Sequence, residues 1–192
     1  MAVAIRMPLL KRFTLSEYLV IERRAATKSE FHQGQILAMA GGMPDHSLIA
    51  SNIGGEFRER LKGGPCRVYN SDLRTAVANG EAVYYADVAV VWGEPKLHRH
   101  HRDVISNPIL VVEVLSRSTA RYDRLVKVPL YQRTPSIQDI LLVSQDRARV
   151  DQISRIAGGW KTVAHSGLAA MIEIPELGCA LPLAGVYANI MI

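Results

Sequence analysis

The sequence predicts an α+β domain in which a mixed central sheet is flanked by helices. The chain has 192 residues, about the length of one domain, and 48% of them are hydrophobic. Its segments occur in the order helix, hairpin, helix, several strands, helix and strands, which is typical of this class. No linker divides the chain, so we expect residues 1–192 to form one domain, with residues 1–12 and the last few residues peripheral to it.

The first expected elements are a helix over residues 13–24 and a hairpin. Thr14 precedes Glu17 by three residues, a capping-box pattern that marks the start of a helix. Two short segments then meet at Gln33 and Gly34, and glycine tolerates the positive φ that such turns require. This pattern predicts a β-hairpin.

An amphipathic helix is expected over residues 44–62. Its apolar side chains recur every four residues, at Ile49, Ile53, Phe57 and Leu61. Residues 66–92 are typical of strands interrupted by a turn at Asn79 and Gly80, and the polar residues 93–108 predict a loop.

The remaining chain begins with a strongly apolar strand at 109–116, followed by a helix. Two further strand segments, 138–144 and 148–163, follow it, the second with a turn at Gly158 and Gly159. The last residues are rich in Leu, Pro and Gly and predict a tail.

The composition favours an ordinary intracellular protein. Lys and Arg number 23 and Asp and Glu 18, so the net charge is +5, which permits binding to nucleic acid but is common among enzymes. Cys66 and Cys179 lie far apart, without the spacing of a zinc knuckle or a disulfide framework. The chain shows neither a secretory signal nor an apolar run near the roughly 18 residues of a membrane span, so we expect a cytoplasmic protein.

Two acidic residues occur in the most apolar strand segments. Glu113 is expected to share a strand face with Val111 and Leu115, and Asp87 lies in a similar run. Burying an unpaired carboxylate costs several kcal/mol, and an Mg²⁺ or Mn²⁺ ion bound by both acids would offset that cost. Either acid alone is more typical of a strand end that faces solvent or pairs with arginine, and the spacing does not exclude that interpretation.

The sequence lacks the motifs of several other enzyme classes. A Gly-x-Ser-x-Gly elbow, a P-loop and a glycine-rich dinucleotide fingerprint are all missing, so the sequence supports no serine hydrolase, nucleotide hydrolase or dehydrogenase and no organic cofactor. His98, His100 and His101 stand between two arginines in the predicted loop. That pattern indicates a solvated or phosphate-facing segment rather than a metal site.

Three segments carry a resemblance to a known family: YYADVAVVW, NPILVVEVLSRSTARYDRLVK and YQRTPSIQDILLVSQDRARVDQISRIAGGW. They resemble the Uma-type restriction endonuclease family, a branch of the PD-(D/E)XK nuclease superfamily, and the similarity extends from Thr14 to Leu183. The resemblance implies an α/β restriction-endonuclease-like core that presents acidic residues to one or two divalent metal ions.

Carried over to this chain, the family pattern makes Asp87 and Glu113 the metal-binding acids. The superfamily lysine usually lies two residues after the second acid, where this chain has Leu115; the resemblance instead implies Lys127, on the following helix. Lys127 would orient the attacking water and offset the charge that develops on the phosphate. Its alternative role is a surface ion pair with Asp123, four residues earlier on the helix.

Glu30 matches a further acid of the family. It is expected to be an additional metal ligand or a group behind the ligands, and the alternative is an exposed acid in the hairpin. Supporting or capping roles are expected for four more residues in matching segments: His46, Asp72, Tyr122 and Asp123.

Two positions depart from the family pattern. Ala86 stands where the family has proline before the first acid, which should loosen the entry to the strand. Pro129 removes a helical hydrogen bond and crowds the carbonyl of Leu125, so we expect the helix that carries Lys127 to kink or stop there.

The resemblance implies an Mg²⁺- or Mn²⁺-dependent endonuclease that hydrolyses phosphodiester bonds in DNA, with RNA as an open alternative substrate. Arg99, Arg102 and Arg117 are candidate contacts to nucleic acid, and cutting both strands of a duplex would favour a homodimer. The competing hypothesis is a non-catalytic nucleic-acid-binding or regulatory protein on a nuclease fold.

Overall fold

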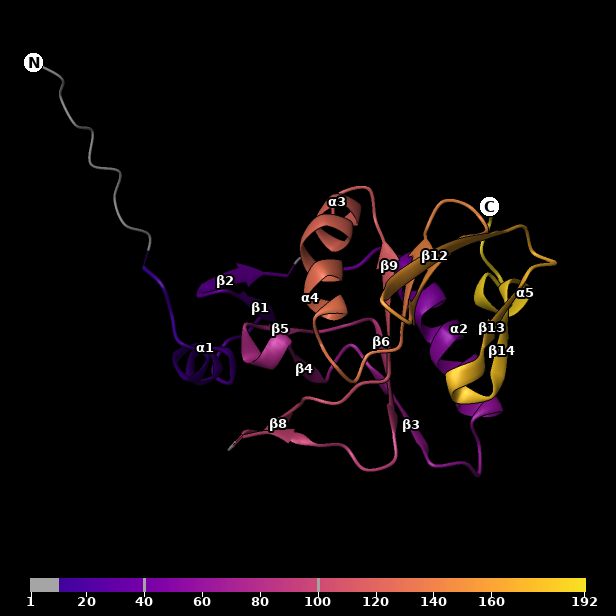
Figure 1. Ribbon diagram of the computed structural model, residues 1–192. Coiled ribbons are helices and arrows are strands. Elements are labelled where there is room, and N and C mark those ends of the chain that lie inside the picture. Colours follow the sequence, from indigo (N-terminus) through magenta and orange to yellow (C-terminus); the bar gives the residue numbers. More distant parts are fainter. Residues whose placement is uncertain (1–10, 40, 100) are drawn as a thin grey trace, which may run out of the picture.

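The computed structural model describes residues 11–39, 41–99 and 101–192. Within these ranges the chain forms two six-stranded sheets and a two-stranded sheet, with helices packed on them (Figure 1). The α+β class and the mixed sheet flanked by helices are therefore confirmed. Of the segment expected to be peripheral at the amino terminus, residues 1–10 lie outside the described residues.

The first sheet has the strand order β2-β1-β5-β4-β8-β7. Its strands are β1 (Ser29–His32), β2 (Gln35–Ala38), β4 (Arg74–Val77), β5 (Ala82–Tyr84), β7 (Leu97–His98) and β8 (His101–Ile105). Helix α1 (Leu15–Glu22) packs on this sheet through Tyr18 and Leu19, and Thr14 and Glu17 form the predicted capping box. The predicted hairpin is present as β1 and β2, with Gly34 at a φ of 90°.

The second sheet has the order β12-β11-β10-β9-β6-β3. Its strands are β3 (Cys66–Asn70), β6 (Val88–Trp92), β9 (Leu110–Leu115), β10 (Asp139–Ser144), β11 (Arg149–Ile156) and β12 (Gly159–Ser166). Strands β9 and β10 run parallel, whereas the other neighbours are antiparallel, so this is the mixed sheet.

Helices cover both faces of the mixed sheet around β9. On one face, Ile53 and Phe57 of α2 (Pro44–Arg60) pack against Val112 and Val114. On the other face lie α3 (Ala120–Tyr122), a π-helical turn (Asp123–Lys127) and α4 (Val128–Gln132). Residues of a strand alternate between faces, so Glu113 projects toward this second helical segment.

The segment expected to be one strand at 84–92 is divided between the two sheets, which corrects that prediction. Strand β5 ends at Tyr84 and β6 begins at Val88, and Asp87 lies in the bend between them, half-buried. The apolar run hides this bend, because both strands are buried on both faces and leave no polar boundary in the sequence.

The predicted polar loop at 93–108 is also wrong, since it contains the hairpin β7–β8. Val104 and Ile105 are buried and pair in parallel with Arg74 and Thr75 of β4. Two apolar residues among many charged ones are too weak a pattern to predict a strand, and the pairing with β4 supplies the missing stabilisation.

The carboxyl-terminal segment is a folded part of the core rather than a tail. It forms β13 (Met171–Ile174), a 3₁₀ turn (Pro175–Leu177), β14 (Cys179–Pro182) and α5 (Leu183–Val186). Another 3₁₀ turn, Ala78–Gly80, joins β4 to β5. Ile172, Leu181 and Leu183 are fully buried beside α2, so the predicted tail is corrected to a packed hairpin and helix.

Pro129 does not stop the helix, which continues to Gln132. The turn before it is π-helical, and the backbone N–H of Val128 donates to the carbonyl of Asp123, five residues earlier. A π turn widens the helix where proline lacks an N–H and crowds the carbonyl of Leu125. The expected disruption is therefore absorbed as a wider turn, and Lys127 lies at its end.

Both cysteines, Cys66 and Cys179, are free thiols, and burial raises the pKa of each. None of the helices in the described ranges combines the length and apolarity that a membrane crossing requires.

Candidate functional site

A buried ammonium and three buried carboxylates meet between β9, β1 and the π turn. The Nζ atom of Lys127 lies 2.9 Å from Oε1 of Glu30, 3.2 Å from Oε1 of Glu113 and 3.6 Å from Oδ1 of Asp123. The Lys127 side chain is only 7% exposed, so the simple surface pair with Asp123 is not what the chain forms. We call these four residues the acid cluster.

Glu113 is held by two donors at one oxygen. Its Oε1 atom accepts hydrogen bonds from the Tyr131 hydroxyl at 2.5 Å and from Lys127 at 3.2 Å. Both donors come from the helical segment, where Lys127 and Tyr131 are four residues apart and therefore on one face. The other oxygen, Oε2, accepts no hydrogen bond from the described part of the chain.

Glu30 reaches the cluster from the hairpin strand β1. The residue is 5% exposed, so the alternative of an exposed hairpin acid is wrong. Its Oε1 atom also accepts a hydrogen bond from the backbone N–H of Tyr85 at 3.2 Å. Glu30 thus connects the first sheet to the helical segment on the second.

Asp87 lies at the edge of the cluster. The residue after it, Val88, pairs with Val112, so Asp87 occupies the position where the β6–β9 ladder ends beside Glu113. Its Oδ2 atom accepts a hydrogen bond from the Val114 N–H at 2.7 Å and lies 3.4 Å from Nε2 of His46. The Asp87 carboxylate is therefore directed toward α2, whereas that of Glu113 is directed toward α4.

The shifted pKa values of the acid cluster show that its four charged groups interact strongly with one another. Burial raises the pKa of the Glu113 carboxyl well above its usual value, although Lys127 lowers it, and the negative charge of Asp87 raises it further. Burial likewise raises the pKa of Glu30 and of Asp123 against the effect of Lys127. Burial alone would lower the pKa of Lys127, but the surrounding carboxylates outweigh it and hold that pKa well above its usual value.

The acid cluster carries more negative than positive charge. Three carboxylates against one ammonium leave two negative charges uncompensated when all four groups are ionised, and such an excess favours proton uptake or a divalent cation. Among residues 11–39, 41–99 and 101–192, no three His, Cys, Asp or Glu side chains form a metal centre.

Mg²⁺ needs only one or two protein carboxylates, because water and substrate phosphate complete its coordination. Oδ1 of Asp87, like Oε2 of Glu113, receives no hydrogen bond from any described residue. Asp87 and Glu113 therefore each keep one carboxylate oxygen free of donors from those residues, which is the kind of atom that binds Mg²⁺.

An aromatic ring lies over the ammonium group of Lys127. The Nζ atom of Lys127 lies 5.2 Å from the ring centroid of Tyr84, a cation–π distance, and the Tyr84 hydroxyl is 2.6 Å from Nδ1 of His32. The Tyr122 ring packs edge-on against His32. Tyr122 and Asp123, expected as supporting residues, therefore lie at the site.

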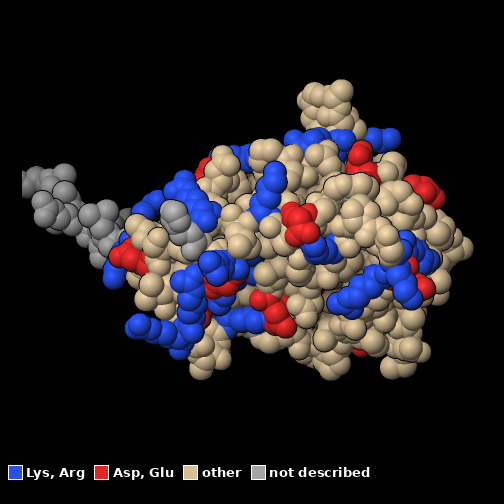
Figure 2. All heavy atoms as spheres, turned by 90° about the horizontal axis from the view of Figure 1, so that it is seen from below, with Lys and Arg blue, Asp and Glu red and all other residues tan. Residues whose placement is uncertain are grey.

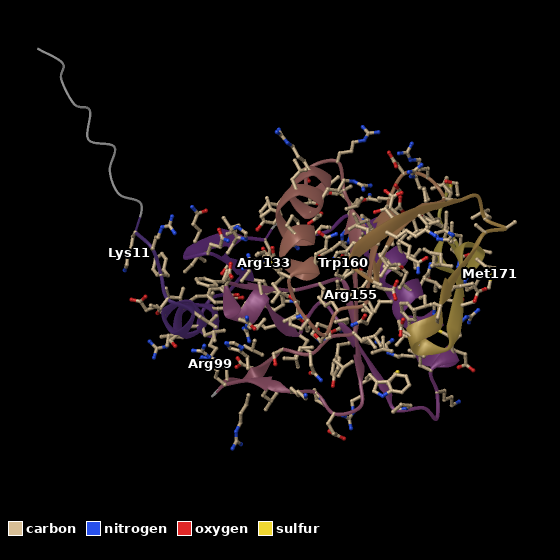
Figure 3. All side chains as sticks on the ribbon, in the orientation of Figure 1. Lys11, Arg99, Arg133, Arg155, Trp160 and Met171 are labelled. Atoms are coloured by element: carbon tan, nitrogen blue, oxygen red, sulfur yellow. The ribbon has the colours of Figure 1, made fainter. Side chains whose placement is uncertain are left out.

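The candidate nucleic-acid contacts do not form one group. Arg99 and Arg102 are exposed on the β7–β8 hairpin, three strands from β1 in the first sheet. Figure 3 places Arg99 well away from α4. Arg117 is exposed in the turn between β9 and α3, directly after the strand that carries Glu113. Of the three arginines, Arg117 is the one whose position in the chain adjoins the acid cluster.

Tyr131 and Tyr84 were not predicted from the sequence as site residues. Asp123, Lys127 and Tyr131 follow one another at intervals of four, a helical spacing that places all three on one face. That spacing could have indicated Tyr131 once Lys127 was a candidate. Tyr84 carries no comparable signal, because its contact with Lys127 joins the first sheet to the helical segment.

Comparisons with known proteins agree with this architecture. Residues 15–184 match the model of the Uma2 family, which is described as "Putative restriction endonuclease". Two proteins of Synechocystis sp. (strain ATCC 27184 / PCC 6803 / Kazusa) are similar along most of their length, and both are described as uncharacterized. The protein slr1290 is 35% identical over 174 residues, 91% of this chain and 90% of its own. The protein sll1609 is 34% identical over 164 residues, 85% of this chain and 93% of its own.

A crystal structure from Anabaena variabilis ATCC 29413, described as a putative nuclease belonging to DUF820, has the same fold. Its TM-score is 0.75 at 17% identity, and the match covers 92% of this chain and 98% of that chain. The expected nuclease-like α+β core is thereby confirmed.

Proposed function

Because the chain belongs to the Uma2 family of putative restriction endonucleases, we propose that it is a metal-dependent endonuclease that hydrolyses phosphodiester bonds in DNA. The observation that carries this proposal is the approach of Lys127 to within 3.2 Å of the buried Glu113, beside Asp87. Two acids and one lysine are the groups that such a hydrolysis requires. Family membership supports the reaction class, and the geometry supports the assignment of residues.

In this proposal Asp87 and Glu113 hold Mg²⁺ or Mn²⁺. The ion would polarise the phosphate and lower the pKa of bound water. Tyr131 fixes one oxygen of Glu113 and leaves the other available. His46 and the Val114 N–H fix one oxygen of Asp87 in the same way.

Lys127 is proposed to act on the phosphate. Its ammonium has three N–H donors and is held by Glu30, Glu113 and Asp123. A phosphate oxygen can replace one of these acceptors, and the positive charge then offsets negative charge that develops in the transition state. Glu30 and Asp123 act as positioning residues, because they hold Lys127 when Glu113 turns to a metal ion.

A cleavage assay with Mg²⁺ or Mn²⁺ tests the proposal. Supercoiled and linear DNA are incubated with purified protein, with and without chelator, and RNA is included as a second substrate. We expect Glu113→Gln and Asp87→Asn to abolish cutting, whereas Glu59→Gln, which changes an exposed acid of α2, should cut like the parent protein. Undiminished cleavage by both site variants would refute the assignment.

A non-catalytic nucleic-acid-binding protein is the second candidate function. It is favoured by the directions of the acids, since Asp87 bonds toward α2 and Glu113 toward α4. Duplex binding in chelator together with the lack of any metal-stimulated cleavage would support it.

Cleavage of both strands would further call for two copies of the chain related by a two-fold axis. Light scattering on the purified protein, with and without duplex DNA, measures the number of copies.

A further inference from the structure

A second polar site lies away from the acid cluster, between the end of α1, the following loop and β4. It is a hollow of about 250 Å³ lined by three cationic side chains, Arg23, Lys28 and Arg74. In Figure 2, Lys and Arg side chains gather toward the end of the molecule that carries the amino-terminal segment. Two carboxylates, Glu22 and Asp72, also line the hollow, and Asp103 pairs with Arg23 and Arg74, so the positive and negative charges balance when all these groups are ionised.

The hollow is built around Tyr85. Nζ of Lys28 lies 5.2 Å from the Tyr85 ring centroid, and the guanidinium carbon of Arg74 lies 5.4 Å from it. The Tyr85 hydroxyl donates to Oε1 of Glu22 at 2.8 Å, and Glu22 also accepts hydrogen bonds from the backbone and hydroxyl of Ser29. Glu22 is thus occupied by internal donors and holds the wall of the hollow in place.

The cations have partners that solvent can reach. Lys28 Nζ lies 2.6 Å from Asp72, whose side chain is 74% exposed, and an ion pair of this kind contributes little stability. Arg23 and Arg74 share the carboxylate of Asp103. The Nε atom of Arg74 is buried and has no hydrogen-bond partner among the described residues. Buried donors are nearly always paired, whereas Arg74 keeps one unused N–H donor in the wall of the hollow.

We propose that this hollow binds a phosphate group, with Lys28 and Arg74 as its donors. A phosphate presents several oxygens to the guanidinium fork of Arg74 and replaces Asp72 as the partner of the Lys28 ammonium. The group is either a backbone phosphate of a bound strand or a free phosphate; the first source rests on the proposed function above.

The hollow is connected to the acid cluster through a single residue. The side chain of Tyr85 lines the hollow, and its backbone N–H donates to Oε1 of Glu30 at 3.2 Å. Glu30 in turn lies 2.9 Å from Lys127. A phosphate bound in the hollow would therefore anchor its strand near Lys127, from which it is separated by Tyr85 and Glu30.

The test measures binding to the full chain in chelator, at one ionic strength. Inorganic phosphate is titrated by calorimetry, and a labelled DNA duplex by fluorescence anisotropy. Lys28→Gln should weaken binding at least about tenfold, because a charge-assisted hydrogen bond is lost, and Lys28→Arg should restore most of it. Lys62→Gln, which removes an exposed lysine after α2, is the matched control and should change neither affinity.

The two titrations separate the sources of the phosphate. If Lys28→Gln weakens binding of inorganic phosphate but not of the duplex, the hollow binds a free phosphate. If Lys28→Gln weakens binding of the duplex, whatever its effect on inorganic phosphate, the hollow binds a backbone phosphate. Equal effects of Lys28→Gln and Lys62→Gln, or no effect of Lys28→Gln on either ligand, would overturn the proposal. Glu113→Gln should retain phosphate binding, which distinguishes failure of this site from failure of the nuclease.

Discussion

The Nζ atom of Lys127 lies 3.2 Å from Oε1 of Glu113, a residue 14 positions earlier on the neighbouring strand. Both side chains are buried, and the same lysine also contacts Glu30 and Asp123. One cation therefore neutralises part of a three-carboxylate cluster, and the properties of the cluster should respond strongly to its removal.

Replacing Lys127 with methionine should reduce both activity and stability. The variant leaves buried carboxylates without their cation, which costs roughly 3 kcal/mol at neutral pH, and cleavage should fall by at least about 100-fold. Urea unfolding and the DNA assay measure the two effects. Lys62→Met, at an exposed site, is the control; normal cleavage by Lys127→Met would contradict the role of the lysine.

Glu113→Gln should raise stability increasingly as the pH rises. Burial raises the pKa of Glu113 in the folded protein, so the folded chain retains a proton that the unfolded chain has already released. The stability of the parent protein therefore falls as the pH rises from about 4 through the raised pKa, and the Gln variant escapes this loss. Thermal unfolding of both proteins in chelator should show a difference that grows from acidic to neutral pH. A constant difference would indicate that Glu113 keeps an ordinary pKa.

Tyr131→Phe removes the hydroxyl that donates to Glu113 at 2.5 Å. The hydrogen bond is buried, so we expect a loss of about 1 kcal/mol in the free energy of unfolding and weaker cleavage at low metal concentration. Tyr69→Phe in β3, a half-buried tyrosine, should leave both unchanged. If cleavage by Tyr131→Phe depends on metal concentration as in the parent protein, Tyr131 does not position Glu113.

His46→Gln should change how the free energy of unfolding depends on pH, through the contact of His46 with Asp87. The hydrogen bond with Asp87 raises the pKa of His46, so the protonated histidine stabilises the folded state at pH values below about 6.5. This contribution disappears as the pH rises through the raised pKa. The free energies of unfolding of the parent protein and the variant should therefore converge as the pH rises. A difference between them that is the same at every pH would show that His46 is not protonated.

Local patterns in the sequence were sufficient for several elements. The capping box at Thr14 and Glu17 and the turn at Gln33 and Gly34 depend on neighbouring residues alone, and the structure contains both. The apolar run around Glu113 is a strand for the same reason. Such features involve few long-range contacts, so the residues that form them are visible in one short window.

Other features depended on pairings that no short window contains. The bend at Asp87 separates strands of two different sheets, and the strand β8 is stabilised by β4. The contact between Tyr84 and Lys127 likewise joins the first sheet to the helical segment. These relationships arise only when segments distant in sequence pack together.

Residue types alone establish the chemical groups of the site: two acids in apolar segments, a lysine on the next helix and a proline two residues beyond it. The position of Lys127 beside Glu113 and Glu30 follows from the packing of distant segments, because a π turn accommodates Pro129 and the helix continues over the sheet. The reason is physical: residue types define which interactions are available, whereas packing between β1, β9 and the helical segment sets their distances.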